Sequence, residues 1–323
     1  MLSIIVIGRN EREHLRRLVS SFQFLRDKWN DVQTIFVDSA SKDGTYEHAI
    51  ELFDECYRLE ESDYLCASAG RAVGTEKATQ EWLLYLDADM EVCPEFFSEV
   101  DLTTKCNENV GYIGKYVNIF DDNHTQITRF KSGNGNGIAR RIGGAVLLRR
   151  EKVLRAGNWN PSLFSHEEDE LYSRLKISNN SIQFIDIPMV KHYTEKRGKV
   201  STLIYILFPW GGMGKKYYGM GQVLAAKTKN REIMAYIKFD PFSFLYWSGI
   251  IFSILLIIFG DLVSGSIILT ATVFLYFIKN GFSDLLIRSA EIPQIITGWF
   301  KYNDKYRPKI VDQFNRLTDI LNH

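Results

Sequence analysis

Three short, almost entirely apolar runs constrain the fold of this sequence more than any other feature. They lie at 2–7, 34–37 and 81–86. A strand that is apolar throughout is typical of a parallel sheet covered on both faces. The first run is followed by Leu15, Leu18, Val19 and Phe22 at helical spacing, and further helices are predicted over 45–53 and 67–78. Strands alternating with helices predict βαβ units in a Rossmann-like, mostly parallel α/β sheet.

Polar residues stand where these strands end. Asn10 follows the first run, Asp38 ends the second, and Asp87 and Asp89 follow the third. Because ligands of open α/β sheets bind beyond the carboxyl ends of the strands, we expect these four side chains to line one site.

The pattern changes after residue 94. The segments 112–120 and 126–130 flank Asp-Asp-Asn-His and predict a hairpin. A strand over 143–148, a helix over 167–177 and a strand over 181–185 follow, and the last of these leads toward His192.

Two long runs without charge, 242–259 and 262–278, are separated only by Gly260 and Asp261. A helix needs roughly 20 apolar residues to cross a bilayer, so both runs predict transmembrane helices joined in a tight hairpin. Basic residues flank the hairpin on both sides, which by the positive-inside rule places the large N-terminal domain at the cytoplasmic side of the membrane. The alternative is an apolar core hairpin in a soluble domain.

These features divide the chain into four expected parts. They are an α/β domain over 1–198, a juxtamembrane, interfacial segment over 199–240, the transmembrane hairpin over 241–279 and an amphipathic tail over 280–323. The interfacial segment is predicted because apolar and aromatic residues at 203–210 precede Lys215 and Lys216.

The composition excludes some classes of partner. Lys and Arg together number 39, as do Asp and Glu, so no net charge indicates a nucleic acid partner. None of the four cysteines has Cys-x-x-Cys spacing, which gives no indication of a zinc or thioredoxin-like site. Formation of a homo-oligomer is left open.

Asp87 and Asp89 are candidate ligands for a metal. Residues i and i+2 at a strand end point to the same side, so their carboxylates converge. Mg²⁺ or Mn²⁺ prefers oxygen ligands and commonly shares them with substrate phosphates. The alternative is a solvated turn, because Asp-x-Asp is common. Asp38 could accept a hydrogen bond from a nucleobase or ribose, or shape a turn.

Two further residues have both a functional and a structural interpretation. Arg71 lies near a predicted helix start, where its guanidinium could bind phosphate or merely face solvent. His192 follows a strand and could ligate the metal or contact a pyrophosphate, although a lone histidine is more often structural.

The run Glu167-Glu168-Asp169-Glu170 opens a predicted helix. Ser165 with Glu168 forms a capping-box pattern, and acidic residues suit a helix N-terminus. The other interpretation is that one carboxylate is a general base that deprotonates an acceptor hydroxyl.

The order of these motifs over residues 2–192 resembles the inverting family 2 glycosyltransferases of the GT-A fold. The resemblance rests on Asn10-Glu11, Val37-Asp38, Ala69-Gly70-Arg71, Asp87-Ala88-Asp89, Gly144 to Arg149, Gly157-Asn158-Trp159-Asn160, the acidic helix start and Val190-Lys191-His192. It implies a nucleotide-diphosphate sugar donor, with a UDP-sugar expected, and a Mn²⁺ or Mg²⁺ cofactor.

The resemblance also implies roles for single residues. Asn10, Glu11, Asp38, Arg71 and Asp87 would bind the nucleotide-sugar, with Asp38 at the base. Asp89 and His192 would hold the metal. The catalytic base would be Glu168, where the family usually has Asp, or its neighbour Asp169. Gly8-Arg9 departs from the family, which usually has a small hydroxyl residue and an aromatic residue there.

The expected activity is sugar transfer to a hydroxyl acceptor, on a lipid-linked or growing glycan, by an enzyme attached to membrane lipid. A polyprenyl-phosphate glycosyltransferase is the first alternative, but its phosphate acceptor is already ionised and needs no base. A non-catalytic, membrane-anchored nucleotide-binding scaffold is the second. A sugar-nucleotide pyrophosphorylase is disfavoured because Gly8-Arg9-Asn10-Glu11 is not a phosphate loop.

Overall fold

The structure is a computed structural model that describes residues 1–62, 64–102, 109–130, 134–177, 181–195, 218–229, 241–280 and 292–316. The chain divides into two compact units. The first comprises Met1–Lys196 together with Asn303–His323, and the second comprises Arg197–Tyr302. Most of the predicted interfacial segment over 199–240 lies outside the described residues.

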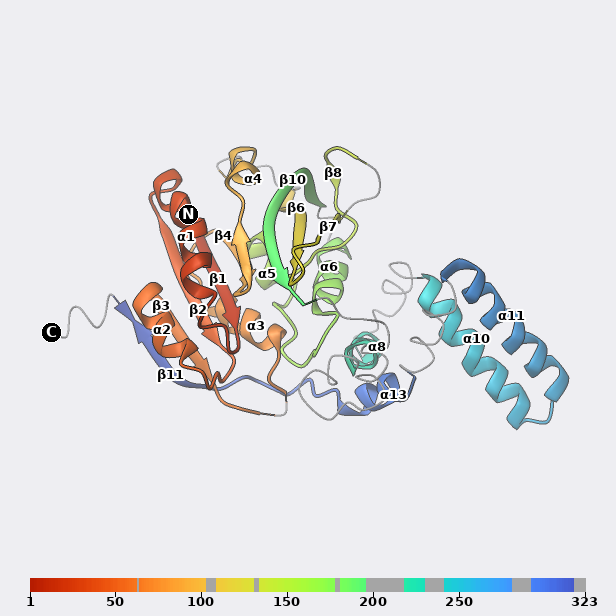
Figure 1. Cartoon of the computed structure of the whole chain (residues 1–323). Coiled ribbons are helices and arrows are strands. Elements are labelled where there is room, and N and C mark those ends of the chain that lie inside the picture. Colours follow the sequence, from red (N-terminus) through yellow and green to blue (C-terminus); the bar gives the residue numbers. More distant parts are fainter. Residues whose placement is uncertain are drawn as a thin grey trace. The chain divides into compact units, whose positions relative to one another are not determined.

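The first unit is built on one mixed sheet (Figure 1). Its main path runs β11-β3-β2-β1-β4-β9-β6-β10-β5, with β7 paired to β6 and β8 paired to β10. The strands are β1 (Leu2–Gly8), β2 (Val32–Asp38), β3 (Glu55–Leu59), β4 (Trp82–Asp87), β5 (Met90–Val92), β6 (Asn109–Phe120), β7 (Thr125–Thr128), β8 (Gly137–Ile138), β9 (Val146–Arg149), β10 (Ser181–Thr194) and β11 (Ile310–Asn315).

The apolar runs form the strands predicted for them. β1 pairs in parallel with β2 on one side and with β4 on the other, and β2 pairs in parallel with β3. Among the other strands that the structure describes, β6 and β10 pair in parallel and the remaining pairings are antiparallel. The sheet is therefore mixed: the four neighbouring strands β3-β2-β1-β4 are parallel as predicted, whereas most pairings in the rest of the sheet are antiparallel.

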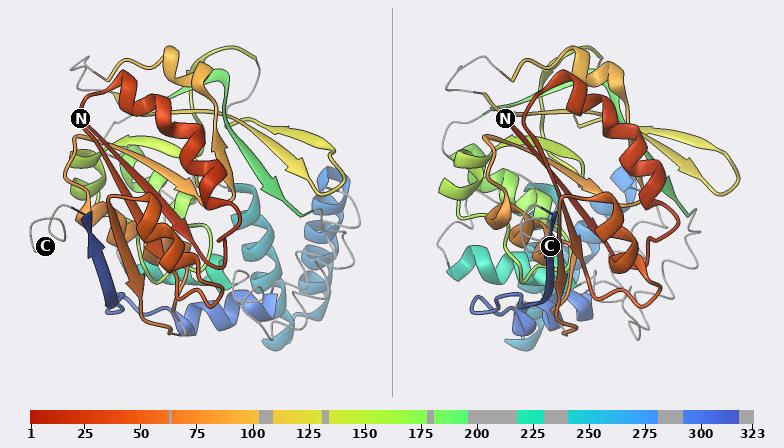
Figure 2. Two further views of the ribbon diagram at one scale, coloured as in Figure 1. Left: turned by 60° about the vertical axis from the view of Figure 1, so that its left-hand side comes forward. Right: turned by 90° about the vertical axis from the view of Figure 1, so that its left-hand side faces the viewer.

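Helices cover both faces of the sheet. α1 and α2 lie on one face, whereas α3, α5 and α6 lie on the other (Figures 1 and 2). The helices of this unit are α1 (Leu15–Lys28), α2 (Thr45–Leu52), α3 (Ala67–Lys77), α4 (Pro94–Ser98), α5 (Arg150–Arg155) and α6 (Glu167–Ile177).

Two glycines let α3 approach β1 closely. A Cβ atom on Gly74 would lie 2.3 Å from Cγ2 of Ile5, and one on Gly70 would lie 3.0 Å from Cγ2 of Ile7. Since the two glycines are four residues apart, they share one face of the helix. This close packing fixes the position of Arg71, which follows Gly70 directly.

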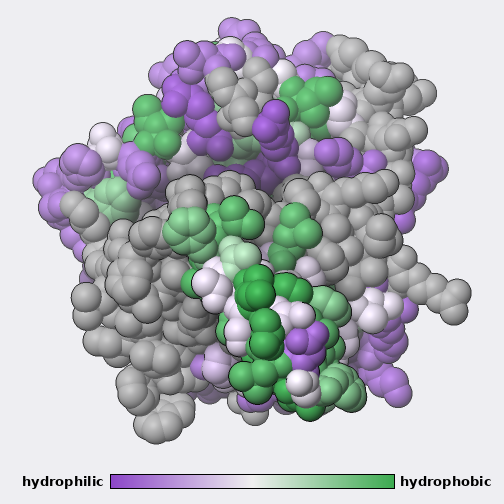
Figure 3. Space-filling model, turned by 90° about the vertical axis from the view of Figure 1, so that its right-hand side faces the viewer, coloured by the Kyte–Doolittle hydropathy of each residue, from purple (hydrophilic) through white to green (hydrophobic). Residues whose placement is uncertain are grey.

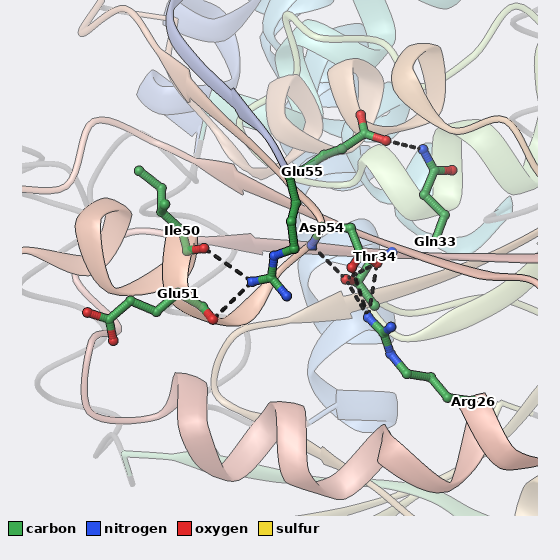
Figure 4. A network of polar contacts seen from close by, with 8 residues as sticks. Arg26, Gln33, Thr34, Ile50, Glu51, Asp54 and Glu55 are labelled. Carbon is green, nitrogen blue, oxygen red and sulfur yellow. Dashed lines mark hydrogen bonds and ion pairs between the residues drawn. The ribbon is translucent and has the colours of Figure 1, made fainter. Parts of the chain in front are cut away.

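β11 comes from the C-terminal end of the chain and was not predicted. It pairs antiparallel with β3 at the edge of the sheet (Figure 2). Just after it, the guanidinium of Arg316 donates to the carbonyls of Ile50 and Glu51. Nearby, Asp54 accepts hydrogen bonds from Thr34 and Arg26, which ties the end of α2 to β2 and α1 (Figure 4).

The second unit contains α8 (Gly219–Lys229), α10 (Pro241–Ile258), α11 (Leu262–Asn280) and α13 (Ile292–Lys301). α10 and α11 form a hairpin, and the side chain of Asp261 accepts the backbone N–H of Ser264 at the start of α11. Gly249 packs on Thr272 and Gly265 on Ser253, so the two helices lie close together.

The prediction of two transmembrane helices is not supported. Both helices are present, but at 18 and 19 residues they reach only the lower limit for a span of roughly 20. Within the residues that the structure describes, none of the helices has the length and apolar character that crossing a membrane requires.

Candidate active site

The carboxyl ends of β1, β2 and β4 meet at one edge of the sheet. Gly8 is in register with Asp38, and Ile7 is in register with Asp87. A cavity of about 290 Å³ opens at this edge. It is lined by Ile7, Gly8, Arg9, Glu11, Ser39, Leu65, Cys66, Ala67, Asp87, Ala88 and Asp89. The strand ends thus place three of the predicted site residues, Glu11, Asp87 and Asp89, around one cavity.

Asp38 lies beside this cavity and is fully buried. Its Oδ2 atom accepts the backbone N–H of Ser41 at 3.0 Å and lies 3.5 Å from Nε of Arg58. Burial raises the pKa of Asp38, and the hydrogen bonds from Ser41 only partly offset this effect. Its Oδ1 atom is buried without a hydrogen-bond partner. Asp38 does not itself line the cavity, and its contact with a nucleobase stays a prediction.

Asn10 and Glu11 stabilise the loop after β1. Asn10 has a φ of 60°, and its Oδ1 atom accepts the backbone N–H of Lys42 at 2.9 Å. The backbone N–H of Glu11 donates to Oγ1 of Thr45. Burial raises the pKa of Glu11, although its hydrogen bond to His14 opposes the shift. Asn10 thus joins the ends of β1 and β2, and its contact with a nucleotide stays a prediction.

Arg71 lies at the centre of a cluster of carboxylates. Its Nη2 atom is 2.8 Å from Oδ1 of Asp87. Its Nη1 atom is 2.7 Å from Oε1 of Glu167 and 3.6 Å from Oε1 of Glu168. The arginine side chain is only 3% exposed and lies over the ring of Trp159. Both terminal nitrogens are engaged by carboxylates, and the contact of Arg71 with phosphate stays a prediction.

A glycine makes room for this cluster. A Cβ atom on Gly144 would lie 2.4 Å from Oδ2 of Asp87 and 2.8 Å from Nη2 of Arg71. Real Cβ atoms essentially never come so close, so any side chain here would displace the pair. Gly144 belongs to the motif Gly144 to Arg149, on which part of the family resemblance rests. Its proximity to Asp87 was not predictable, because the two residues lie 57 positions apart in the sequence (144 − 87).

The four acidic residues at the start of α6 differ in their surroundings. Arg71 pairs with Glu167, Arg174 pairs with Glu170, and His166 lies 3.5 Å from Asp169. Burial and the neighbouring charge of Glu167 raise the pKa of Glu168 to about 8, although Arg71 opposes the shift. The raised pKa gives Glu168 a proton affinity suited to general-base chemistry near neutral pH.

The capping-box interpretation of Glu168 does not fit the helix start. The box requires Ser165 at the N-cap and helical geometry from residue 166 onward. α6 begins at Glu167, and His166 has a φ of 60°, which is left-handed rather than helical. Glu168 is consequently one position too early in the helix for that role.

Asp89, which directly precedes β5, lies close to His192 on β10. Nε2 of His192 lies 3.3 Å from Oδ2 of Asp89, and its Nδ1 atom lies 3.0 Å from Oδ1 of Asn118. Burial lowers the pKa of His192, but the hydrogen bond with Asp89 and the charges of Asp89, Asp87 and Glu11 raise it overall. The Oδ1 atom of Asp89 is buried without a hydrogen-bond partner.

This pair offers two groups to a divalent cation. The unpartnered Asp89 oxygen and the His192 imidazole fit the oxygen and nitrogen ligands that such ions accept. Across the described part of the chain, no cluster of three His, Cys, Asp or Glu side chains is placed to hold a metal. The remaining ligands would have to come from water and substrate oxygens.

Comparisons with known proteins agree with this fold. Residues 3–153 match the model of Glycosyl transferase family 2. The crystal structure of S. aureus TarS 1-349 has a TM-score of 0.52 and 14% identity, and the match covers 93% of this chain and 90% of that one. The complex of the same TarS fragment with UDP-GlcNAc gives a TM-score of 0.50 at 14% identity and the same coverage.

A third structure is that of GalNAc-T7 with UDP, GalNAc and Mn²⁺. Its TM-score is 0.51 at 16% identity, and the match covers 69% of this chain. The chain spans about half of that protein, with 51% covered. No curated protein sequence matches the chain. The structural likeness supports the expected GT-A-like fold, and the stretch of the chain that is similar to Glycosyl transferase family 2 is residues 3–153.

Proposed function

We propose that the protein is an inverting glycosyltransferase that moves a sugar from a UDP-sugar to an acceptor hydroxyl. The observation that carries the proposal is the Arg71 cluster, which links Asp87 in the cavity wall to Glu168 at the start of α6. The similarity to family 2 and the two structural neighbours that contain UDP or UDP-GlcNAc support it.

The nucleotide would lie over the ends of β1 and β2. A uracil imide offers an N–H donor, and the buried Oδ1 atom of Asp38 is an acceptor without a partner. A buried acceptor left unpaired costs roughly 1–3 kcal/mol, so a ligand that supplies a donor there is favoured. Asp87 lines the cavity wall and would contact the ribose or sugar.

Asp89 and His192 would hold Mn²⁺ or Mg²⁺ with the diphosphate. When bound, the ion would neutralise charge on the leaving diphosphate. The protein itself supplies the two side chains of Asp89 and His192. Asn118 orients the His192 ring through a hydrogen bond to Nδ1 of that ring.

Glu168 would act as the base, with Asp169 as the alternative. Its carboxylate takes the proton of the acceptor hydroxyl while the oxygen attacks the anomeric carbon. The bond from that carbon to the diphosphate oxygen breaks, and UDP leaves with the electron pair. Attack opposite the leaving group inverts the anomeric centre.

The need for a base supports a hydroxyl acceptor, on a lipid-linked or growing glycan. A phosphate acceptor would give Glu168 no proton to remove, so a polyprenyl-phosphate glycosyltransferase is the second candidate. A non-catalytic scaffold is the third. It gains nothing from gathering three carboxylates around one buried guanidinium, which is costly unless the groups are used.

Attachment to a membrane surface is a further part of the proposal. The α10–α11 hairpin exposes large apolar side chains, including Ile251, Ile258, Phe259, Leu262 and Val263. Figure 3 shows hydrophobic residues gathered on this part of the second unit. Exposed apolar patches of this kind mark interaction sites, and lipid is the occupant we propose, with the catalytic domain on the cytoplasmic side. Binding to vesicles, lost on changing Ile258 and Phe259 to Ser, would test the attachment.

Calorimetric titration of the purified protein with UDP, GDP and dTDP, with and without Mn²⁺, tests the donor assignment. We expect UDP to bind in a metal-dependent way and Asp89→Asn to weaken that binding. A folded protein that binds none of the three nucleotides would make the scaffold the better interpretation.

A further inference from the structure

The C-terminal residues 303–316, here called the strap, pack against the domain that carries the site. β11 of the strap pairs with β3. The backbone N–H of Glu60 donates to the carbonyl of Lys309 at 2.8 Å, and that of Arg316 donates to the carbonyl of Asp54 at 2.9 Å. The strap is therefore anchored along the edge strand independently of any side chain near the cavity.

At its N-terminal end the strap contacts two loops through side chains. The ring of Tyr306 stacks on Tyr64, with centroids 5.0 Å apart and planes inclined by 30°. Tyr64 in turn stacks on Phe164 at 6.1 Å and 16°. The hydroxyls of Tyr306 and Ser62 lie 3.2 Å apart. Three aromatic rings thus connect segments that are far apart in the sequence.

Both loops lead directly into the candidate site. Leu65, Cys66 and Ala67, which follow Tyr64, line the cavity. Phe164 precedes Glu167 by three residues and Glu168 by four. A displacement of either ring would therefore move the cavity wall or the start of α6.

Polar contacts join the same segments. The hydroxyl of Ser162 donates to the carbonyl of Asn303 in the strap. The thiol of Cys66 donates to the carbonyl of Pro161 at 3.3 Å, and the hydroxyl of Ser68 donates to the carbonyl of Asn160 at 2.6 Å. The loop before α6 is thus held against both the strap and the start of α3.

We propose that Tyr306 is a positioning residue for sugar transfer. Through Tyr64 and Phe164 it fixes the spacing between the wall of the donor cavity and the carboxylates at the start of α6. This inference rests on the proposed glycosyltransferase function. Because the strand pairing of β11 anchors the strap separately, Tyr306 can be changed without releasing the strap.

The test compares Tyr306→Ala with Tyr306→Phe, which keeps the ring and loses only the hydroxyl. Val311→Ala is the matched control, because Val311 lies on β11 and is 58% exposed. Misplacement of reacting groups by about 1 Å can cost 10²-fold in rate. We expect kcat/KM for the UDP-sugar to fall roughly 10- to 100-fold in Tyr306→Ala. Tyr306→Phe and Val311→Ala should stay near the wild-type value.

Hydrogen exchange supplies a readout that does not depend on activity. In Tyr306→Ala we expect faster amide exchange at residues 64–68 and 164–168, with unchanged exchange in β1 and β4. If Tyr306→Ala fails to fold, Tyr306→Leu keeps an apolar side chain without the stacked ring and takes its place.

The outcomes separate this inference from the proposed function. If the wild-type protein neither binds UDP nor turns over a UDP-sugar, the proposed glycosyltransferase function is contradicted. Hydrogen exchange at residues 64–68 and 164–168 then still tests whether Tyr306 positions the two loops. Active wild-type protein with unchanged kcat/KM and unchanged exchange in a folded Tyr306→Ala variant overturns the role of Tyr306.

Discussion

Oδ1 of Asp87 lies 2.8 Å from Nη2 of Arg71, although the two residues come from different elements, the end of β4 and the middle of α3. The same guanidinium also pairs with Glu167. Arg71 therefore connects the cavity wall to the acidic start of α6. The positions of the Asp87 and Glu167 carboxylates therefore depend on one buried cation.

The first prediction concerns removal of that cation. Arg71→Met should destabilise the fold by about 3–5 kcal/mol, because it leaves Asp87 and Glu167 buried without their counter-charge. Arg71→Lys should retain part of the stability but not the fork geometry that reaches both carboxylates. Urea unfolding measures the difference, and a loss below about 1 kcal/mol in Arg71→Met would contradict the buried cluster.

The second prediction uses the glycine that accommodates the cluster. Gly144→Ala places a methyl group where Asp87 and Arg71 now meet, so one of them must move. We expect weaker UDP binding and lower turnover with the fold retained, and destabilisation of about 1–3 kcal/mol, as is typical of overpacking. Wild-type turnover in the alanine variant would show that the site tolerates displacement of the pair.

The third prediction is a pH dependence. The folded-state pKa of Glu168 is raised to about 8, whereas the ordinary value is 4.5. A base must be deprotonated, so kcat/KM should rise with pH and level off above about 8. The stability contribution has the opposite sign, because the folded state holds the proton more tightly. It is present below about pH 4.5 and is lost as pH rises through about 8.

Glu168→Gln should remove the contribution of Glu168 to the pH dependence of the free energy of unfolding, since glutamine does not titrate. Urea unfolding of both proteins at pH 5 and pH 8 measures the change. An equal loss of stability with rising pH in both proteins would assign the effect to other groups.

The fourth prediction concerns backbone strain beside Asp38. Ala40 has a φ of 55°, a left-handed conformation that costs a non-glycine residue roughly 1–2 kcal/mol. Ala40→Gly should therefore stabilise the fold by about 0.5–1 kcal/mol, because part of the gain is offset by the greater freedom of the unfolded chain. Ala49→Gly in α2 is the control and should destabilise by about 1 kcal/mol. Destabilisation by both changes would refute the strain at Ala40.

The parts of the fold that the sequence predicted carry strong local signals. β1, β2 and β4 are buried along nearly their whole length, so their apolar runs marked them clearly. β3 was not predicted because it has only five residues and two of them, Glu55 and Arg58, are charged. β11 was not predicted because four of its six residues are polar or exposed. The pairing of β11 with β3 joins segments about 250 residues apart, which no local pattern reveals.

The site was predictable as a gathering of residues at strand ends, but not in its contacts. Asp38, Asp87 and Asp89 do lie at one edge of the sheet, as strand order requires. The environment of Arg71 was not predictable, because its partner Glu167 lies 96 residues away. The apolar runs at 242–259 and 262–278 were correctly expected to be helical, whereas their predicted span of a membrane is not supported.

The most direct test of the account is the turnover of Glu168→Gln. UDP release from a UDP-sugar would be measured for wild type and variant, with UDP affinity and the melting temperature recorded in parallel. If Glu168 is the base, turnover should fall by roughly 10²–10⁴ while UDP affinity and the fold are retained. Near-normal turnover in the folded variant would contradict the assignment and transfer the role to Asp169 or to no residue of α6.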